Sequence, residues 1–189
     1  MTGAPTARLF FQKEVPAMIR LATAADLPAV EAIYDAILTQ EENGAVYTNW
    51  QRGKYPTIDT ARQVLEAGTL YVGEENGTVW GAVNLNGIQL PEYDQIPWKI
   101  PAEQEQVGVI HTLVIHPAMS RQGYARAMVE FCEEESRRQG KTAIRLDTWE
   151  GNLPANRMYP ALGYSFAGAT EFFFQGFIHE ILNCYEKAL

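Results

Sequence analysis

The chain has few of the residues that build cross-links or metal sites. Its 189 residues include two cysteines, Cys132 and Cys184, and three histidines. Two cysteines cannot form a disulfide framework, and these two lack the paired spacing of a zinc site. We therefore expect a protein of the reducing cytoplasm that holds no metal.

The chain is also short of positive charge. It has 15 lysines and arginines against 23 aspartates and glutamates, a formal net charge of -8, and no basic cluster interrupts the acidic residues. Because phosphate contacts supply most of the affinity for nucleic acid, we expect no nucleic-acid partner. A negative field instead favours cationic small molecules such as amines.

Long hydrophobic runs are missing as well. The longest, such as residues 107–115, fall far short of the roughly 20 residues that span a bilayer. At the N-terminus, Arg8 precedes three apolar residues before Gln12, so a signal-peptide core is lacking. We therefore expect no membrane partner.

What remains is the composition of an ordinary globular domain, with 47% hydrophobic and 20% charged residues. At roughly 150 residues per domain, the length predicts one domain. Residues 1–17 show no clear period, whereas residues 18–21 form a strand-like segment. We predict an N-terminal extension over residues 1–17 and a single domain over residues 18–189.

Hydrophobic periodicity predicts alternating strands and helices after residue 21. The first half has helices at 23–40 and 57–67 and a hairpin of strands 69–73 and 78–85. The second half has strand 107–116, buried on both faces, and then helix 123–139, strand 142–148, helix 154–162 and strands 164–168 and 180–186. The order strand, helix, strand implies a parallel pair with a right-handed crossover.

Two segments carry further expectations. Residues 87–106 contain three prolines and suit neither helix nor strand; long ordered loops of this kind are usually functional, and an insertion without a role is the alternative. In the helix at 123–139, one face is mainly apolar. Its other face is expected to meet solvent through Glu130, Glu133, Glu134, Arg137 and Arg138.

The turn into that helix is the strongest local signal for a ligand. Residues 120–125 read Ser-Arg-Gln-Gly-Tyr-Ala and place small residues at a helix start. Backbone N–H groups there have no helical acceptor and the helix dipole is positive, so the turn suits a phosphate group. The glycine patterns of a Rossmann turn and of a P-loop are both absent.

Together with its flanks, this turn resembles the GNAT superfamily of acyl-CoA-dependent N-acyltransferases. The resemblance rests on Leu-Val-Ile-His-Pro at 113–117, the turn at 120–125 and Asn-Arg-Met-Tyr at 156–159 followed by Leu-Gly-Tyr at 162–164, and it covers most of residues 18–189. Ser120 departs from the arginine or glutamine that the family often has. Because main-chain N–H groups hold the pyrophosphate, this change should weaken coenzyme binding and not abolish it.

The resemblance implies an α/β fold: a central mixed sheet with a splayed strand pair, flanked by helices. It also implies acetyl-CoA as co-substrate. The backbone of Leu113, Val114 and Ile115 would pair with the pantetheine arm, and an N–H near Leu113 would stabilise an oxyanion. The pyrophosphate would bind the N–H groups of Arg121, Gln122, Gly123, Tyr124, Ala125 and Arg126, and the side chain of Asn156 would reach the pantetheine.

The resemblance also implies the catalytic groups. Tyr159 would be the general acid for the leaving thiolate, a role that suits a phenol with a pKa of ~10. His111 is the candidate base, and by strand alternation it shares a face with Val109 and Leu113. Glu103, Glu105 or water alone are the alternatives.

These expectations describe an N-acetyltransferase that moves an acetyl group from acetyl-CoA to a primary amine by direct attack in a ternary complex. The acceptor is a small molecule or a peptide, and aromatic residues in the loops, such as Tyr47, Trp50, Tyr93 and Trp98, suggest a partly aromatic acceptor cleft. A homodimer stays open. The alternative is an acyl-CoA-binding regulatory module that transfers nothing.

A chain that begins at Met18 is expected to fold with unchanged thermal stability, because the family-like domain starts there. Thermal unfolding of the truncated and full-length proteins checks this. A fall in Tm of more than about 4 °C, equivalent to about 1 kcal/mol at this size, would show instead that Leu9, Phe10 and Phe11 pack on the core.

Overall fold

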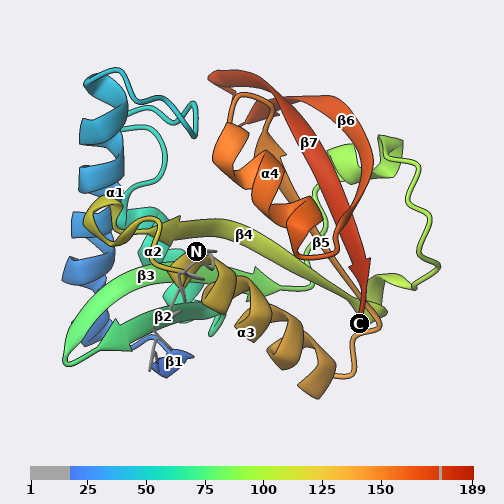
Figure 1. The fold of residues 1–189 in the computed structure, drawn as a ribbon, viewed down its shortest axis with the longest axis horizontal. Helices are drawn as coiled ribbons and strands as arrows, with labels where there is room; N and C mark the ends of the chain where they lie inside the picture. The colour runs from blue at the N-terminus through green and yellow to red at the C-terminus, as the bar shows by residue number, and fades with distance from the viewer. Residues whose placement is uncertain (1–17, 175) are drawn as a thin grey trace, which may run out of the picture.

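The computed structural model describes residues 18–174 and 176–189, where seven strands form one sheet in the order β1-β2-β3-β4-β5-β7-β6 (Figure 1). Within this part of the chain, β4 and β5 are the parallel pair and all other neighbours are antiparallel. The predicted extension, residues 1–17, lies outside the described residues. The strands are β1 Met18–Leu21, β2 Leu70–Glu75, β3 Thr78–Asn86, β4 Val107–Ile115, β5 Ala143–Trp149, β6 Ser165–Phe174 and β7 Ile178–Ala188.

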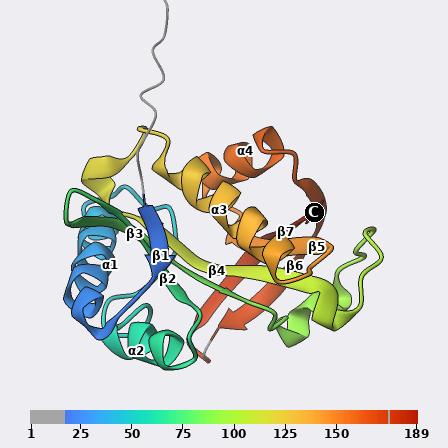
Figure 2. The same cartoon turned by 90° about the horizontal axis from the view of Figure 1, so that it is seen from below.

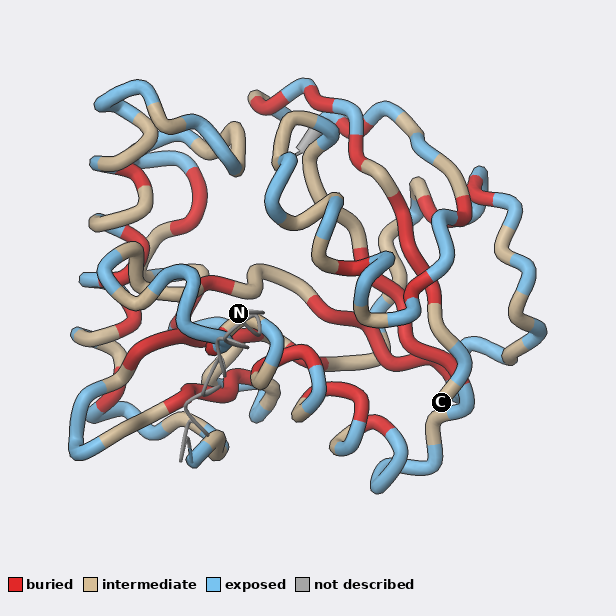
Figure 3. Tube along the Cα trace, viewed as in Figure 1, coloured by how far each residue is buried: buried red, intermediate tan, exposed pale blue. Residues whose placement is uncertain are grey.

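Helices cover both faces of the sheet. Figure 2 shows α1 (Leu27–Glu42) and α2 (Ile58–Glu66) on one face, and α3 (Tyr124–Arg138) and α4 (Leu153–Ala161) on the other. Each helix turns its apolar stripe to the strands, so Val30 packs with Val72 on the α1 face and Met128 with Ile144 on the α3 face. Figure 3 shows the buried residues along the strands and the inner sides of the helices. The predicted mixed α/β fold is confirmed.

Residues 87–106, the long loop, cover the β5–β7 half of the sheet on the α1 side. Tyr93 and Ile96 are buried there in one cluster with Leu182 and Cys184. The buried carboxylate of Glu186 accepts hydrogen bonds from the backbone N–H groups of Lys99 at 2.7 Å and Ile100 at 3.3 Å. These contacts hold the loop firmly against the sheet.

The parallel pair comes apart halfway along its length. β4 and β5 are in register from Val107 opposite Ala143 only as far as Ile110 opposite Leu146. Beyond that point β4 stays paired with β3 up to Ile115, whereas β5 stays paired with β7 up to Trp149. The sheet therefore opens into a wedge between the second halves of β4 and β5, as the splayed pair predicts.

A bulge in β4 lies inside this wedge. The register with β3 shifts between Asn84 opposite His111 and Ala82 opposite Val114, and Thr112 takes a left-handed backbone with φ 48. A bulge sets two residues against one and shifts the alternation of side chains. Leu113 accordingly packs in the same cluster as Ile110. The expectation that His111 shares a face with Leu113 is therefore wrong.

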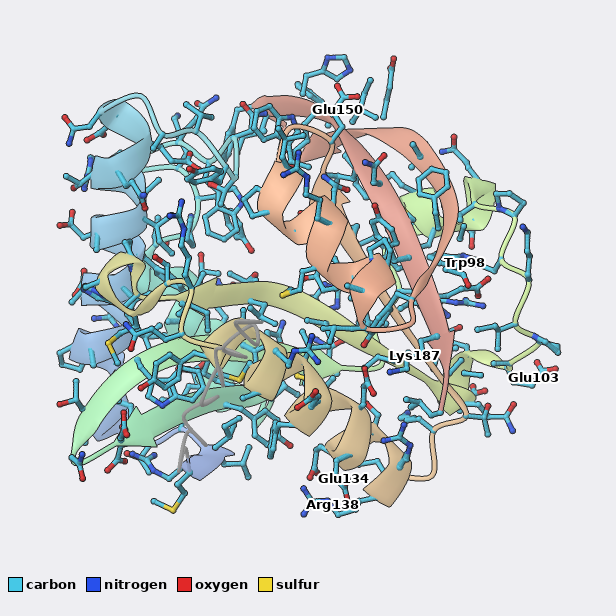
Figure 4. All side chains as sticks on the ribbon, viewed as in Figure 1. Trp98, Glu103, Glu134, Arg138, Glu150 and Lys187 are labelled. Carbon is cyan, nitrogen blue, oxygen red and sulfur yellow. The ribbon has the colours of Figure 1, made fainter. Side chains whose placement is uncertain are left out.

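Two further expectations need correction. Strand β4 was expected to be buried on both faces, but in its second half only Val114 is buried, and the other residues are half-buried because they line the wedge. In α3, Glu134 and Arg138 project away from the sheet as expected (Figure 4). Glu133, however, is 5% exposed and accepts a hydrogen bond from Lys187 Nζ at 2.7 Å. Helical periodicity could not show that β7 brings a lysine to this position.

Lys187→Met is expected to destabilise the protein by about 2 kcal/mol, because it leaves the buried carboxylate of Glu133 without its hydrogen-bonding cation. Urea unfolding measures the change. Arg62→Met is the control, since Arg62 pairs with Asp59 on the surface of α2 and such pairs contribute under about 1 kcal/mol. Equal losses in the two variants would contradict the importance of the buried pair.

Candidate active site

A cavity of about 920 Å³ occupies the wedge between β4 and β5. On one side of the sheet its walls are the end of β4, the start of α3 and α4. On the other side they are the β5 end, β7 and the segment between α1 and α2. The cavity therefore passes through the opening in the sheet and connects its two faces.

The turn before α3 forms one end of the cavity. Arg121 and Gly123 both take left-handed backbone conformations, with φ 62 and φ 92. Among the described residues, no oxygen accepts a hydrogen bond from the backbone N–H groups of residues 121–126. Six free donors at the positive end of a helix form a cradle for an anion such as a phosphate.

Most residues of this turn line the cavity, whereas Gln122 does not. Arg121, Ala125 and Arg126 line the cavity together with Gly123 and Tyr124. Tyr124 is buried against Trp80, with ring centroids 4.6 Å apart, and donates to Glu75 Oε2 at 2.5 Å, which anchors the start of α3. Gln122 is exposed, is not among the lining residues and donates to the Ala118 carbonyl at 3.3 Å.

The edge of β4 forms the middle of the cavity. Leu113, Val114 and Ile115 all line it, and none of them has a partner on β5. Their backbone groups on the β5 side are therefore available to a ligand, much as an exposed sheet edge is available to a peptide strand.

Tyr159 closes the cavity from α4. Its ring is 5% exposed and lies 5.7 Å from the rings of both Tyr164 and Tyr185, measured between centroids. Its hydroxyl forms no hydrogen bond within the described part of the chain. Burial, and then the charge of Asp147, raise the pKa of Tyr159, so the phenol carries its proton at neutral pH.

Asn156 lies one turn before Tyr159 but does not line the cavity. Its amide nitrogen donates to the carbonyls of Asn152 at 2.9 Å and Trp149 at 3.0 Å. Its Oδ1 accepts from Asn183 Nδ2 and from the Tyr185 hydroxyl, both at 2.9 Å. In this structure the side chain fastens α4 to β5 and β7, and contact with a pantetheine stays a prediction.

His111 lines the cavity on β4 with a defined tautomer. Its Nε2 lies 3.0 Å from the Ile88 carbonyl oxygen and 3.2 Å from Asn86 Oδ1. Because a carbonyl only accepts, Nε2 carries a hydrogen and Nδ1 keeps its lone pair. Burial lowers the pKa of His111, and the bond to Ile88 partly opposes this effect. The ring is therefore neutral at pH 7 and able to take a proton.

The other groups considered as bases are not in the cavity. Glu103 and Glu105 are exposed in the long loop and do not line it, and Figure 4 shows Glu103 at the outer edge of the molecule. His116 accepts a hydrogen bond from Ala118 N at 3.2 Å on its Nδ1 and so caps the turn that follows β4. His179 faces Glu171 at 3.4 Å on exposed strands.

Two carboxylates that line the cavity, Asp147 and Glu180, were not predicted from the sequence. Asp147, at the end of β5, accepts a hydrogen bond from the Tyr93 hydroxyl at 2.8 Å, and burial raises its pKa to about 6. Glu180, on β7, is 8% exposed, and burial raises its pKa to about 7. A carboxylate inside a predicted apolar strand was the signal that could have pointed to both.

The described residues contain no helix long and apolar enough to cross a membrane. Among curated protein sequences, none matches the chain. The sequence profile of the Acetyltransferase (GNAT) family, by contrast, matches residues 30–164, which is more than half of the chain.

Solved structures share the fold. An N-acetyltransferase from Staphylococcus aureus Mu50 is 23% identical with a TM-score of 0.66, over 91% of this chain and 98% of that one. A GCN5-related N-acetyltransferase from Kribbella flavida is 21% identical with a TM-score of 0.68, over 92% of this chain and 98% of that one. The structure of yncA from Salmonella typhimurium, solved with its cofactor acetyl-CoA, is 21% identical with a TM-score of 0.65, over 92% of this chain and 94% of that one. By its family profile and its fold, this chain belongs to the GNAT family of acetyltransferases.

Proposed function

We propose that the protein transfers the acetyl group of acetyl-CoA to a primary amine by direct attack within a ternary complex. The observation that carries this proposal is the wedge itself, because one cavity joins a cradle of free N–H groups to a protonated tyrosine and a neutral histidine. Family membership supports the acetyl transfer. The neutral histidine supports an amine as the acceptor, because an attacking amine must lose a proton.

The residues present fit acetyl-CoA. Free N–H groups at 121–126, with the exposed Arg121 and Arg126 beside them, suit a pyrophosphate. The unpaired edge of Leu113, Val114 and Ile115 suits the amides of the pantetheine arm. Acetyl-CoA supplies an activated acyl thioester. An N–H of the unpaired β4 edge would then donate to the thioester carbonyl oxygen and stabilise the negative charge that develops on it.

Proton transfer falls to two side chains. His111 accepts the proton of the attacking amine on Nδ1, directly or through a water, and the Ile88 carbonyl stabilises the imidazolium through Nε2–H. Tyr159 gives its proton to the departing thiolate. A C–N bond replaces the C–S bond, and one proton is taken up for each proton released.

A regulatory module that binds acyl-CoA without transferring the acyl group is the alternative. Incubation with acetyl-CoA and a panel of primary amines separates the two. Release of the free thiol together with acetylated amine, identified by mass spectrometry, supports the transferase. Tight binding of CoA with no release in the presence of any amine favours the module.

Gly123→Val is expected to weaken CoA binding at least about tenfold in titration calorimetry. A valine at φ 92 is strained, and relief of that strain changes the backbone conformation that places the free N–H groups. Gly140→Val is the matched control: Gly140 has φ +77 and equally open surroundings, but it follows α3 outside the cavity. Unchanged CoA affinity in Gly123→Val would contradict the location of the pyrophosphate.

Tyr159→Phe is expected to lower turnover by roughly 100- to 10,000-fold and to leave acetyl-CoA affinity unchanged, because the hydroxyl acts on the leaving group. Steady-state kinetics and calorimetry measure the two quantities. Tyr164→Phe removes a hydroxyl from the adjacent ring outside the cavity and serves as control. If Tyr159→Phe keeps turnover within about twofold of the control, another group is the acid.

A further inference from the structure

The two ends of the cavity carry opposite charge. At the α3 end lie the free N–H groups of 121–126 with Arg121 and Arg126, and these are the arginines of the described lining. At the other end, on the α1 side of the sheet, the charged lining residues are Asp147 and Glu180, and no lysine lines the described cavity. One end therefore suits an anion, and the other end suits a cation.

Asp147 and Glu180 are held on one face of the sheet. Asp147 is opposite Cys184 and Trp149 is opposite Leu182 in the β5–β7 register, so strand alternation places Glu180 on the same face. The Tyr93 hydroxyl fixes the Asp147 carboxylate at 2.8 Å. Asn49 Nδ2 donates to Glu180 Oε2 at 3.3 Å. Both carboxylates have a fixed place in the wall of the cavity.

Neither carboxylate has a cation of its own within the described residues. Glu180 is more than nine-tenths buried, forms no ion pair there, and only one of its oxygens accepts a hydrogen bond. The charged groups that act on it are Asp147 and Glu41, both acidic. A buried carboxylate surrounded by like charge is costly unless a cation reaches it. The cavity is the route by which one can arrive.

The walls around these carboxylates are aromatic. Trp50 and Tyr55, in edge contact with centroids 5.5 Å apart, line this end together with Tyr47 and Trp149. Aromatic faces attract organic ammonium groups, and their apolar bodies pack against methylene chains. An acceptor with a negative group would meet Asp147 and Glu180 with no lysine or arginine beside them.

We propose that the acceptor is an organic dication without a carboxylate, an alkyl diamine or an amine with a guanidinium group, whose second cationic group binds Glu180. This inference rests on the proposed function and narrows its substrate class. Asp147 lies beside the reacting end, where its charge also acts on Tyr159. Glu180 holds the distal cation and sets specificity.

Binding and turnover of three probes test the proposal: 1,5-diaminopentane, n-pentylamine and lysine. The first two differ only in the second amine, and the first and third differ only in the carboxylate. Calorimetry with CoA-bound protein at about pH 8, above the pKa of Glu180, gives affinities that need no catalysis. The diamine is expected to bind at least about tenfold more tightly than either other probe.

Glu180→Gln keeps the shape and the hydrogen bond to Asn49 but removes the charge. It is expected to weaken diamine binding at least about tenfold and to change n-pentylamine binding less than about twofold. Glu171→Gln, an exposed carboxylate on β6, is the control and should change neither affinity.

Equal affinity of the wild-type protein for diamine and monoamine, or for diamine and lysine, would overturn the acceptor class and leave the transferase proposal standing. The proposed function fails separately, if acetyl-CoA binds and none of the amines in the panel is acetylated. Diamine binding that depends on Glu180 would in that case support only the cation site at Glu180, and the diamine would no longer be an acceptor.

Discussion

The loss of pairing between β4 and β5 beyond Ile110 and Leu146 is the constraint on which the rest of the structure depends. Parallel strands normally continue their ladder, and stopping it leaves backbone groups that need other partners. Here β3 holds one strand and β7 holds the other, so the sheet stays whole while it opens in the middle. The opening is what lets one cavity reach both faces.

Rigid supports on both sides keep that opening in shape. On the β4 side, the bulge at Thr112 turns Leu113 toward α3 and leaves His111 facing the long loop, where the Ile88 carbonyl fixes its tautomer. On the β5 side, the long loop is fastened by Glu186 and places Tyr93 on Asp147. Packing and hydrogen bonds of this kind hold functional groups in the geometry that a site needs.

Burial also sets the charge states that the site needs. It raises the pKa of Tyr159, which keeps the phenol protonated, and it lowers the pKa of His111, which keeps the imidazole neutral. The same effect raises the pKa of Asp147 to about 6 and that of Glu180 to about 7, and the hydrogen bonds from Tyr93 and Asn49 oppose it only in part. Burial thus acts on the proton donor Tyr159, on the proton acceptor His111 and on the two carboxylates, all in one cavity.

The sequence by itself determined the element order and the helix start after residues 120–123, because periodicity and glycine placement are local properties of the chain. Short motifs that resemble those of the family also singled out Tyr159 and His111, both of which line the cavity. The features that depend on strand pairing and burial were decided only by the tertiary structure. A bulge placed Leu113 on the face opposite to the one expected. Glu133 is buried and paired with a lysine of β7. The side-chain amide of Asn156 forms hydrogen bonds to other residues of the protein. Asp147 and Glu180, far apart in the sequence, met in one wall because β5 and β7 are neighbours in the sheet, and no local pattern records that pairing.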